Sequence, residues 1–397
     1  MGIHTFYTNF IKKYPEIVKP RSECGTYDNL YMDCNSFVYE VFHKLQKEYD
    51  EGELLQEKID SYGNIENLII EEVKKEITRQ IKIISPKKYI FIAFDGVAEK
   101  SKKRQQRDRR FKKIIAGMID NVKKLWDTNQ ITAGTPFMDK LSESIYEHFH
   151  PEDFGVEQID ISCSDEPGEG EHKFIIQEGR DIIYGMDSDL LMIWNIDLYR
   201  GEDEVICVSE LEKPVNKKYI LLGNDYIPGL ASFQELEFVD IEVNTVEDFQ
   251  TVICQVKKNR KSDEFSNNIK TRNKLHDNSQ YVGTSRVRYY KAMCNTTDIN
   301  SVCRKYFEGL KYSLEMYINK KSVSNWSYCL SSTANSTFDT CGAPLLDDLC
   351  VVNIDGLYIP QDDYDKIDSV YEFSELEVSR LLSMCSMCVL CGLLRLC

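Results

Sequence analysis

Two pairs of acidic residues have a spacing that could support metal chemistry. Glu169 and Glu171 flank one glycine, and Asp187 and Asp189 flank one serine. On an extended backbone, side chains two positions apart point the same way, so each pair presents two carboxylates together. Clustered carboxylates repel one another unless a cation neutralises them, and oxygen ligands suit Mg²⁺ or Mn²⁺ better than zinc. Two such ions, about 3.5–4 Å apart, can clamp the attacking and leaving oxygens of a phosphodiester.

Short apolar runs that end in an aspartate indicate which further carboxylates would join these pairs. Such runs lead to Asp33, Asp95, Asp187 and Asp225. The runs before Asp95 and Asp187 are short, rich in β-forming residues and without alternation, which is typical of strands buried on both faces of a parallel sheet. The run over 219–222 is too short to assign and could equally close a helix. Because ligands bind outside the carboxyl ends of such strands, these aspartates should converge.

The candidate metal-binding and catalytic set therefore contains seven acids. Its members are Asp33, Asp95, Glu169, Glu171, Asp187, Asp189 and Asp225. Any one of the 65 acids in the chain that follows a strand is more often a turn former or a helix cap. Seven acids in one arrangement instead favour an active site that binds metal ions.

A basic stretch follows Asp95. Nine of the fourteen residues over 100–113 are Lys or Arg, although the whole chain has a net charge of −16. Such an acidic chain alone argues against a nucleic-acid partner, but a local basic patch can coexist with it. On a helix, four side chains share one face and could hold a terminal phosphate: Lys102, Gln106, Arg109 and Arg110. The alternative is a solvated basic helix or a nuclear-import run.

Helical patterns separate the apolar runs. They cover residues 38–49, 65–83 and 137–149. Strands that alternate with helices form βαβ units and a sheet of mainly parallel strands. The predicted fold is therefore α/β, with a mostly parallel central sheet flanked by helices.

Changes in composition divide the chain into four parts. We expect a catalytic core, a charged connector or exposed excursion, a helical segment and a cysteine-containing C-terminal region, over residues 1–235, 236–285, 286–330 and 331–397 in that order. The connector is assigned from the polar residues over 255–280, which offer little apolar surface to bury. A helical pattern over 288–317 predicts a helical C-terminal extension.

The fourteen cysteines fit a reducing compartment. The N-terminus lacks the charged and apolar pattern of a secretory signal, so we expect reduced thiols and a cytoplasmic protein. No apolar run reaches the length of about 18 residues that a membrane span needs, so no membrane partner is expected.

Near the end, Cys385, Cys388, Cys391 and Cys397 could bind zinc, although the first three would also lie along one side of an ordinary buried helix.

Several short segments resemble successive motifs of the XRN-type 5′→3′ exoribonucleases. They occur in the order of that family and cover residues 1–3, 32–35, 94–98, 105–111, 131–138, 167–173, 184–190 and 222–228. The phrase Pro-Gly-Glu-Gly-Glu-His-Lys over 167–173 is specific, whereas a motif such as Phe-Asp-Gly says little alone. Residues 306–312 are similar to the second conserved segment of the family.

The resemblance implies a PIN/FEN-like nuclease core whose seven acids bind Mg²⁺ or Mn²⁺, as two ions. It implies that the four basic-face residues named above hold the 5′-monophosphate of the substrate. Tyr39 stands where the family usually has a histidine that stacks on the first base. An aromatic ring can still stack there, so we expect Tyr39 to keep that role.

The expected activity is the processive degradation of single-stranded, 5′-monophosphorylated RNA to mononucleotides during mRNA decay. We expect a monomer that acts after a decapping enzyme. The many Asn, Ile, Lys and Tyr residues suggest a large DNA virus, for which the location would be the host cytoplasm. Two alternatives stay open: a 5′ nuclease such as a flap endonuclease acting on DNA, and a non-catalytic RNA-binding relic.

Overall fold

The computed structural model describes residues 3, 5–54, 56–98, 102, 106, 125–259, 285–294, 296–319, 328 and 343–359. Within these residues the chain forms a seven-stranded sheet of order β1-β7-β6-β5-β2-β3-β4. The strands are β1 Val18–Pro20, β2 Asn29–Asp33, β3 Tyr89–Ala93, β4 Gln158–Ser162, β5 Asp181–Tyr184, β6 Asp197–Tyr199 and β7 Glu204–Ile206. The run from β4 to β6 is parallel, and β7 and β1 extend it antiparallel.

Both faces of the sheet are covered by helices, which explains why its central strands read as unbroken apolar runs. In β3, Ile90 and Ile92 pack toward one core, and Tyr89 and Phe91 pack toward the other. The first core is closed by α2 Asn35–Asp50, α4 Ile65–Ile84 and α6 Pro136–His148. The second is closed by α1 Phe6–Lys13, α8 Leu190–Trp194 and the 3₁₀ helix η6 Lys217–Leu222.

Two of the helices that border the sheet, α4 and α6, begin at recognisable caps. The Asn64 side chain accepts a hydrogen bond from the Asn67 amide at the start of α4. Thr135 caps α6 in the same way, and Pro136 at the first helical position presets the backbone for a helix. These local signals fix where the two helices begin.

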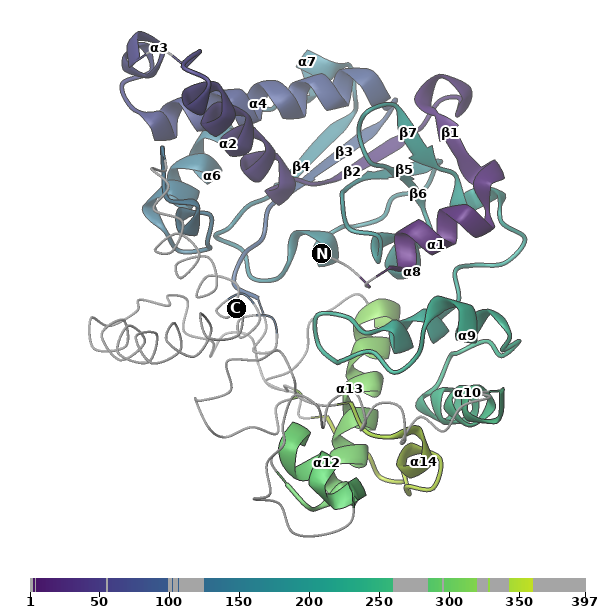
Figure 1. Cartoon of the computed structure of the whole chain (residues 1–397). Helices are drawn as coiled ribbons and strands as arrows, with labels where there is room; N and C mark the ends of the chain where they lie inside the picture. Colours follow the sequence, from purple (N-terminus) through teal and green to yellow (C-terminus); the bar gives the residue numbers. More distant parts are fainter. Residues whose placement is uncertain are drawn as a thin grey trace, which may run out of the picture.

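A second group of helices lies below the sheet in Figure 1, with α13 rising toward it. It contains α9 Phe233–Glu237, α10 Val246–Asn259, α12 Ser285–Cys294, α13 Ile299–Asn319 and α14 Leu346–Leu349. The remaining short helices are α3 Gln56–Ser61, α7 Pro151–Phe154, η1 Pro15–Ile17, η2 Arg21–Glu23, η3 Thr128–Gln130, η4 Gly170–His172 and η5 Val208–Glu210. None of the helices that the structure describes is both long enough and apolar enough to cross a membrane.

The predicted α/β class and mostly parallel sheet are confirmed, as is the helical extension that follows them. The runs that lead to Asp33, Asp95 and Asp187 are β2, β3 and β5, and the helical patterns between them are α2, α4 and α6. The unassigned run over 219–222 belongs to η6. Local apolar patterning was sufficient for these elements because each is either a strand buried on both faces or a helix with one buried side.

Two expectations for the middle of the chain need correction. Residues 246–259 were expected to belong to an exposed connector over 236–285, but they form α10, whose Phe249, Val252, Ile253 and Val256 are buried. Their spacing is that of one helix face, and the polar residues beyond it obscured the pattern. Residues 260–284 lie outside the described part of the chain, as do the C-terminal cysteines from Cys385 onward.

The helical pattern over 288–317 is also interrupted. It is divided between α12 and α13, with a break at Thr296–Asp298. Asp298 Oδ1 accepts a hydrogen bond from the Ser301 amide at 3.0 Å and so caps the start of the second helix. The new start lets α13 take its own direction toward the sheet.

A backbone clamp joins the loop after β3 to the loop after β4. The Gly96 amide donates to Gly168 O at 2.8 Å, and the Gly168 amide donates to Val97 O at 3.0 Å. The half-buried Lys173 reinforces the clamp, because its ammonium donates to Phe94 O and Cys163 O at 2.8 and 2.7 Å. The clamp holds the acidic residues of the two loops, described below, in fixed relative positions.

The clamp predicts a steric effect at Gly96. A Cβ at this position would lie 1.6 Å from the carbonyl oxygen of Glu166, which is backbone and cannot move aside alone. Gly96→Ala should therefore lower the free energy of unfolding by about 3 kcal/mol, measured by urea denaturation. Gly52→Ala, where the added carbon meets nothing within 4 Å, should cost about 1–2 kcal/mol for its left-handed backbone alone. Equal losses in the two variants would contradict the steric argument.

Candidate active site

The carboxyl ends of three adjacent parallel strands bring acidic residues to one edge of the sheet. Asp33 is the last residue of β2, Asp95 lies two residues beyond β3, and Asp187 lies three residues beyond β5. The chain adds β3 and β4 on one side of β2 and later places β5 on the other. The order of the strands therefore reverses between β2 and β5, and ligands bind at such switch points in open α/β sheets.

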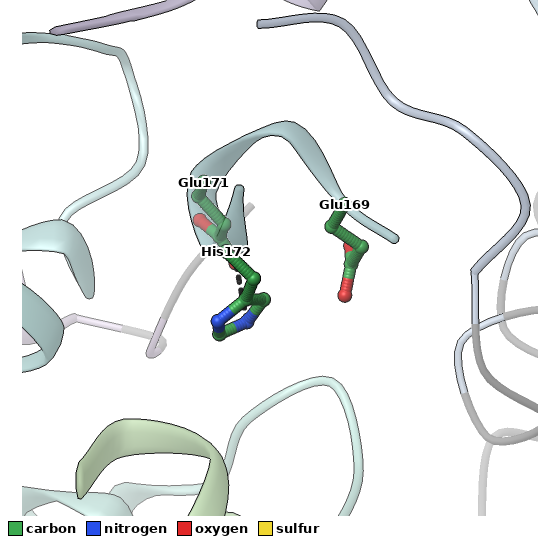
Figure 2. A group of neighbouring side chains, drawn as sticks. All are labelled: Glu169, Glu171 and His172. Atoms are coloured by element: carbon green, nitrogen blue, oxygen red, sulfur yellow. Dashed lines mark ion pairs between the residues drawn. The ribbon is translucent and has the colours of Figure 1, made fainter. Parts of the chain in front are cut away.

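Glu169 and Glu171 reach this edge from the loop between β4 and β5. The Gly170 amide between them donates to Asp95 Oδ1 at 2.7 Å. A Cβ on Gly170 would lie 3.1 Å from Asp33 Oδ1 and 3.5 Å from Asp95 Oδ1, so the absence of a side chain lets this backbone approach the other acids. Figure 2 shows the two glutamates close together on the chain, Glu171 within the single turn η4 and Glu169 immediately before it.

Asp189 and Asp225 complete the cluster from two further segments. Asp189 immediately precedes α8, and its Oδ2 accepts a hydrogen bond from the hydroxyl of Tyr317 at 2.9 Å. Asp225 lies in the turn after η6, where Asn224 Oδ1 accepts from the amides of Tyr226 and Ile227 at 2.9 and 3.0 Å. That turn presents Asp225 toward the cluster.

Burial and mutual repulsion raise the pKa values of two of these acids, Asp33 and Asp95. The pKa of Asp33 lies well above its usual value because of burial and because the carboxyl faces the carboxylates of Asp95 and Asp187. Burial also raises the pKa of Asp95, with a further contribution from Glu169. A protein that ionises these acids at neutral pH must supply positive charge at this position.

The same effect raises the pKa values of Glu171 and Asp189. Burial raises the pKa of Glu171 well above its usual value, and the charges of Asp189 and Glu169 raise it further. Burial and repulsion from Asp187 and Asp225 raise the pKa of Asp189 to about 7. Through these interactions the structure brings all seven of the acids singled out in the sequence into one cluster.

The donor atoms of the cluster fit a hard divalent cation. Asp33 Oδ1 and Asp189 Oδ1 are buried and have no hydrogen-bond partner among the described residues. A buried polar atom without a partner is costly and calls for an explanation, and a coordinated ion is one. The oxygen ligands and the concentrated negative charge suit Mg²⁺ or Mn²⁺.

Lys102 occupies a different place from the one its basic helix face suggested. Its ammonium is buried and lies 2.6 Å from both Glu169 Oε1 and Asp225 Oδ2. Burial alone would lower the pKa of Lys102, but the surrounding carboxylates outweigh it and raise that pKa well above its usual value. In this structure, Lys102 therefore supplies positive charge to the acidic cluster.

The other residues expected to bind the 5′ end are described less fully. Gln106 is half-buried, and Tyr39 is exposed on α2, with 37% of its surface accessible. Arg109 and Arg110 lie outside the described residues. The assignment of these four residues to RNA binding stays a prediction.

Sequence reasoning overlooked two kinds of residue at the site. His172 lies beside the glutamates in Figure 2, with its Nε2 3.6 Å from Glu171 Oε1, and burial lowers its pKa to about 4, so its ring is neutral at pH 7. Tyr226 and Tyr317 donate hydroxyl hydrogen bonds to Glu169 Oε2 and Asp189 Oδ2. His172 belongs to the specific phrase over 167–173 and could have been noticed, whereas no local pattern marks the tyrosines.

The buried position of Lys102 yields a prediction for stability. Lys102→Met should lower the free energy of unfolding by about 3–5 kcal/mol in metal-free buffer, because it leaves Glu169 and Asp225 buried without their counter-charge. Lys140→Met, which removes an exposed pair with Glu66, should cost less than about 1 kcal/mol. Urea denaturation of the two variants tests the difference. A loss for Lys102→Met as small as that for Lys140→Met would contradict the role given to its ammonium.

The N-terminal half of the chain matches a known protein family. Residues 1–196 match the family model of the XRN 5′-3′ exonuclease N-terminus. A 5′-3′ exoribonuclease 2 of Eremothecium gossypii is 31% identical over 252 residues, or 49% of this chain and 25% of that protein. The corresponding protein of Candida albicans is 28% identical over 310 residues, or 64% of this chain and 31% of that protein.

Other relatives give a similar result. A 5′-3′ exoribonuclease 1 of Saccharomyces cerevisiae is 30% identical over 284 residues, which is 61% of this chain and 17% of that protein. The matched regions thus span less than a third of the length of these relatives. A solved structure of the catalytic core of Rad2 in complex with a DNA substrate gives a TM-score of 0.36 at 14% identity, over 73% of this chain and 84% of that one. A likeness that distant supports no conclusion about function.

The family model and the relatives confirm the resemblance that the ordered motifs indicated. Residues 1–196, which carry six of the seven clustered acids, are similar to the N-terminal exonuclease domain of the XRN family.

Proposed function

We propose that this chain is a metal-dependent 5′→3′ exoribonuclease that hydrolyses single-stranded, 5′-monophosphorylated RNA to mononucleotides. The observation that carries the proposal is the cluster of seven carboxylates at the carboxyl edge of the sheet, in which buried oxygens of Asp33 and Asp189 have no hydrogen-bond partner within the described part of the chain. The names of the relatives, which are 5′-3′ exoribonucleases, support this substrate class and direction. The catalytic core would occupy residues 1–235.

The seven acids would share the metal ions between them. We expect two ions of Mg²⁺ or Mn²⁺, held by Asp33, Asp95, Glu169, Glu171, Asp187, Asp189 and Asp225. Bound there, they would supply Lewis-acid polarisation of the phosphodiester and a water activated at neutral pH. The chain contributes the arrangement of the ligands: the Gly170 amide holds Asp95, and the surrounding burial excludes water and strengthens each electrostatic contact.

The 5′ end would be read by the basic stretch beside the cluster. Lys102, near the start of that stretch, already extends to Glu169 and Asp225. Gln106, Arg109 and Arg110 would hold the terminal phosphate, and Tyr39, exposed on α2, would stack on the first base. With divalent ions bound, Glu169 and Asp225 would no longer need the Lys102 ammonium as a counter-charge. Lys102 would then contact the terminal phosphate together with Gln106, Arg109 and Arg110.

The remaining proposals concern the setting of the reaction. Removal of the cap from an RNA leaves a 5′-monophosphate. Decapping is therefore the class of reaction that would supply the substrate, and a decapping enzyme would act first. We propose that the chain acts as a monomer in the cytoplasm, which is the host cytoplasm if the source is a virus.

The metal assignment predicts loss of activity without loss of fold. Asp187→Ala and Asp189→Ala should each slow hydrolysis of 5′-monophosphorylated RNA at least about a hundred-fold, because each removes a ligand from the ions that stabilise the transition state. Asp50→Ala, an exposed aspartate at the end of α2, should leave the rate unchanged. The rates are measured with Mg²⁺ on gels, and circular dichroism checks the fold.

The same assay separates the proposal from its alternatives. Comparable decay of 5′-triphosphorylated and 5′-monophosphorylated RNA would contradict recognition of the 5′-monophosphate. Faster cleavage of a DNA flap than of RNA would favour a DNA 5′ nuclease. A well-folded wild-type chain that cleaves neither would favour an RNA-binding relic.

The 5′-phosphate pocket predicts an effect that depends on the substrate. Arg109→Ala should slow decay of 5′-monophosphorylated RNA by about ten- to a hundred-fold, the value of a charge-assisted hydrogen bond of about 1.5–3 kcal/mol. The same variant should lose little on 5′-hydroxyl RNA, which has no phosphate to lose. Arg109→Lys should recover little of the rate, because an ammonium cannot reproduce the guanidinium fork.

The comparison of initial rates on the two RNAs decides between a pocket and a general basic patch. A patch predicts equal losses on both substrates, and losses that shrink as salt is added. That outcome would remove Arg109 from the proposed 5′-phosphate site.

A further inference from the structure

Helix α13 touches the acidic cluster from far along the chain. The hydroxyl of Tyr317 donates to Asp189 Oδ2 at 2.9 Å, across 128 positions of sequence. One turn earlier, Ser313 Oγ accepts a hydrogen bond from Asn224 Nδ2 at 3.0 Å. Side chains four positions apart lie on the same face of a helix. One face of α13 is therefore directed at two of the segments that carry acids.

The contact with Asp189 fixes one of its two oxygens. Tyr317 and Asp189 are both buried, with 3% and 8% of their surfaces accessible. With Oδ2 held by the hydroxyl, the carboxylate cannot rotate without breaking a buried hydrogen bond. Its Oδ1 has no hydrogen-bond partner among the described residues. A carboxylate in this state offers one oriented oxygen, which is how outer hydrogen bonds prepare metal ligands.

The contact with Asn224 supports the turn that holds Asp225. The Ser313 side chain is fully buried, and its hydroxyl oxygen accepts a hydrogen bond from the side-chain NH₂ of Asn224. The oxygen of the same Asn224 side chain closes the turn by accepting from the Tyr226 amide. The adjacent Tyr312 packs edge-on against Tyr226, with ring centroids 5.2 Å apart. The Tyr226 hydroxyl in turn donates to Glu169 Oε2 at 3.1 Å.

Helix α13 is itself held firmly against the catalytic core. Its Tyr306 hydroxyl donates to Pro228 O at 2.8 Å, which closes the far side of the same turn. Its Phe307, Leu310 and Leu314 are buried in the apolar core that also contains α8 and η6. This packing therefore holds the hydroxyls of Ser313 and Tyr317 in fixed positions relative to the acids.

We propose that α13 completes the metal site from outside residues 1–196, and that Tyr317 is a positioning residue that orients Asp189 toward a divalent cation. The inference rests on the proposed function, because it requires the acidic cluster to bind metal. It extends that function by adding a segment that carries none of the seven acids. A purely structural Tyr317 would stabilise the fold without changing the affinity for the ion.

The chain offers a matched control in Tyr290. This buried tyrosine on α12 donates its hydroxyl at 2.6 Å to Asp348, a buried aspartate that is not one of the clustered acids. Tyr317→Phe and Tyr290→Phe thus both remove a hydroxyl that donates to a buried aspartate, and the Tyr290 hydroxyl also accepts from the Leu345 amide at 2.9 Å. Tyr317→Phe should lower the melting temperature by about 2–4 °C, and Tyr290→Phe should lower it by at least as much.

The decisive readout is the binding of Mn²⁺ to the full chain, measured by titration calorimetry without RNA. Tyr317→Phe should raise the dissociation constant for Mn²⁺ about ten-fold. Tyr290→Phe should stay within about two-fold of the wild type. With RNA present, Tyr317→Phe should lower kcat at limiting Mn²⁺, leave KM for RNA unchanged, and recover as Mn²⁺ is raised.

A second variant tests the helix as a whole. Ser313→Ala, which removes the support of the Asn224 turn, should also weaken Mn²⁺ binding and should add to the effect of Tyr317→Phe. Wild-type affinity in Tyr317→Phe, or an equal loss in Tyr290→Phe, would overturn the positioning role and leave the proposed function standing. A wild-type chain that binds no Mn²⁺ would overturn both.

Discussion

Repulsion among buried carboxylates is the constraint on which the rest of this structure depends. The sheet brings the ends of β2, β3 and β5 together, and each strand ends at or near an aspartate. Burial alone disfavours ionised acids, and their proximity raises the cost further, as the elevated pKa values of Asp33, Glu171 and Asp189 reflect. A bound cation would neutralise this repulsion, and the residues around the cluster reduce its electrostatic cost.

The surrounding chain offsets this repulsion in three physically different ways. A backbone amide, that of Gly170, donates directly to Asp95, and this approach is possible because glycine has no side chain to collide with the cluster. The buried ammonium of Lys102 neutralises charge between Glu169 and Asp225. The hydroxyls of Tyr226 and Tyr317 donate to further carboxylate oxygens without adding charge. Two acids nevertheless keep a buried oxygen without a partner among the described residues, which is where a cation fits best.

This arrangement makes the site a product of distant parts of the chain. The domain that the family model matches ends at residue 196, before the turn that holds Asp225 and long before α13. Yet α13 packs on α8 and η6, the elements that adjoin Asp189 and Asp225. The helical extension and the sheet therefore pack together around the acids, so a boundary drawn at the end of the matched domain would divide the site.

The sequence by itself determined the elements and the identity of the acids. Strands β2, β3 and β5 and helices α2, α4 and α6 follow from apolar patterns, which are encoded within each segment. The seven acids could be named because strand ends and the i, i+2 pairs are also local features. Tertiary structure alone decided that Lys102 faces Glu169 and Asp225, that α10 is buried, and that Tyr317 reaches Asp189. The contacts of Lys102 and Tyr317 join residues more than sixty positions apart, and a hydrogen bond of 2.9 Å depends on how whole helices pack, which no local pattern records.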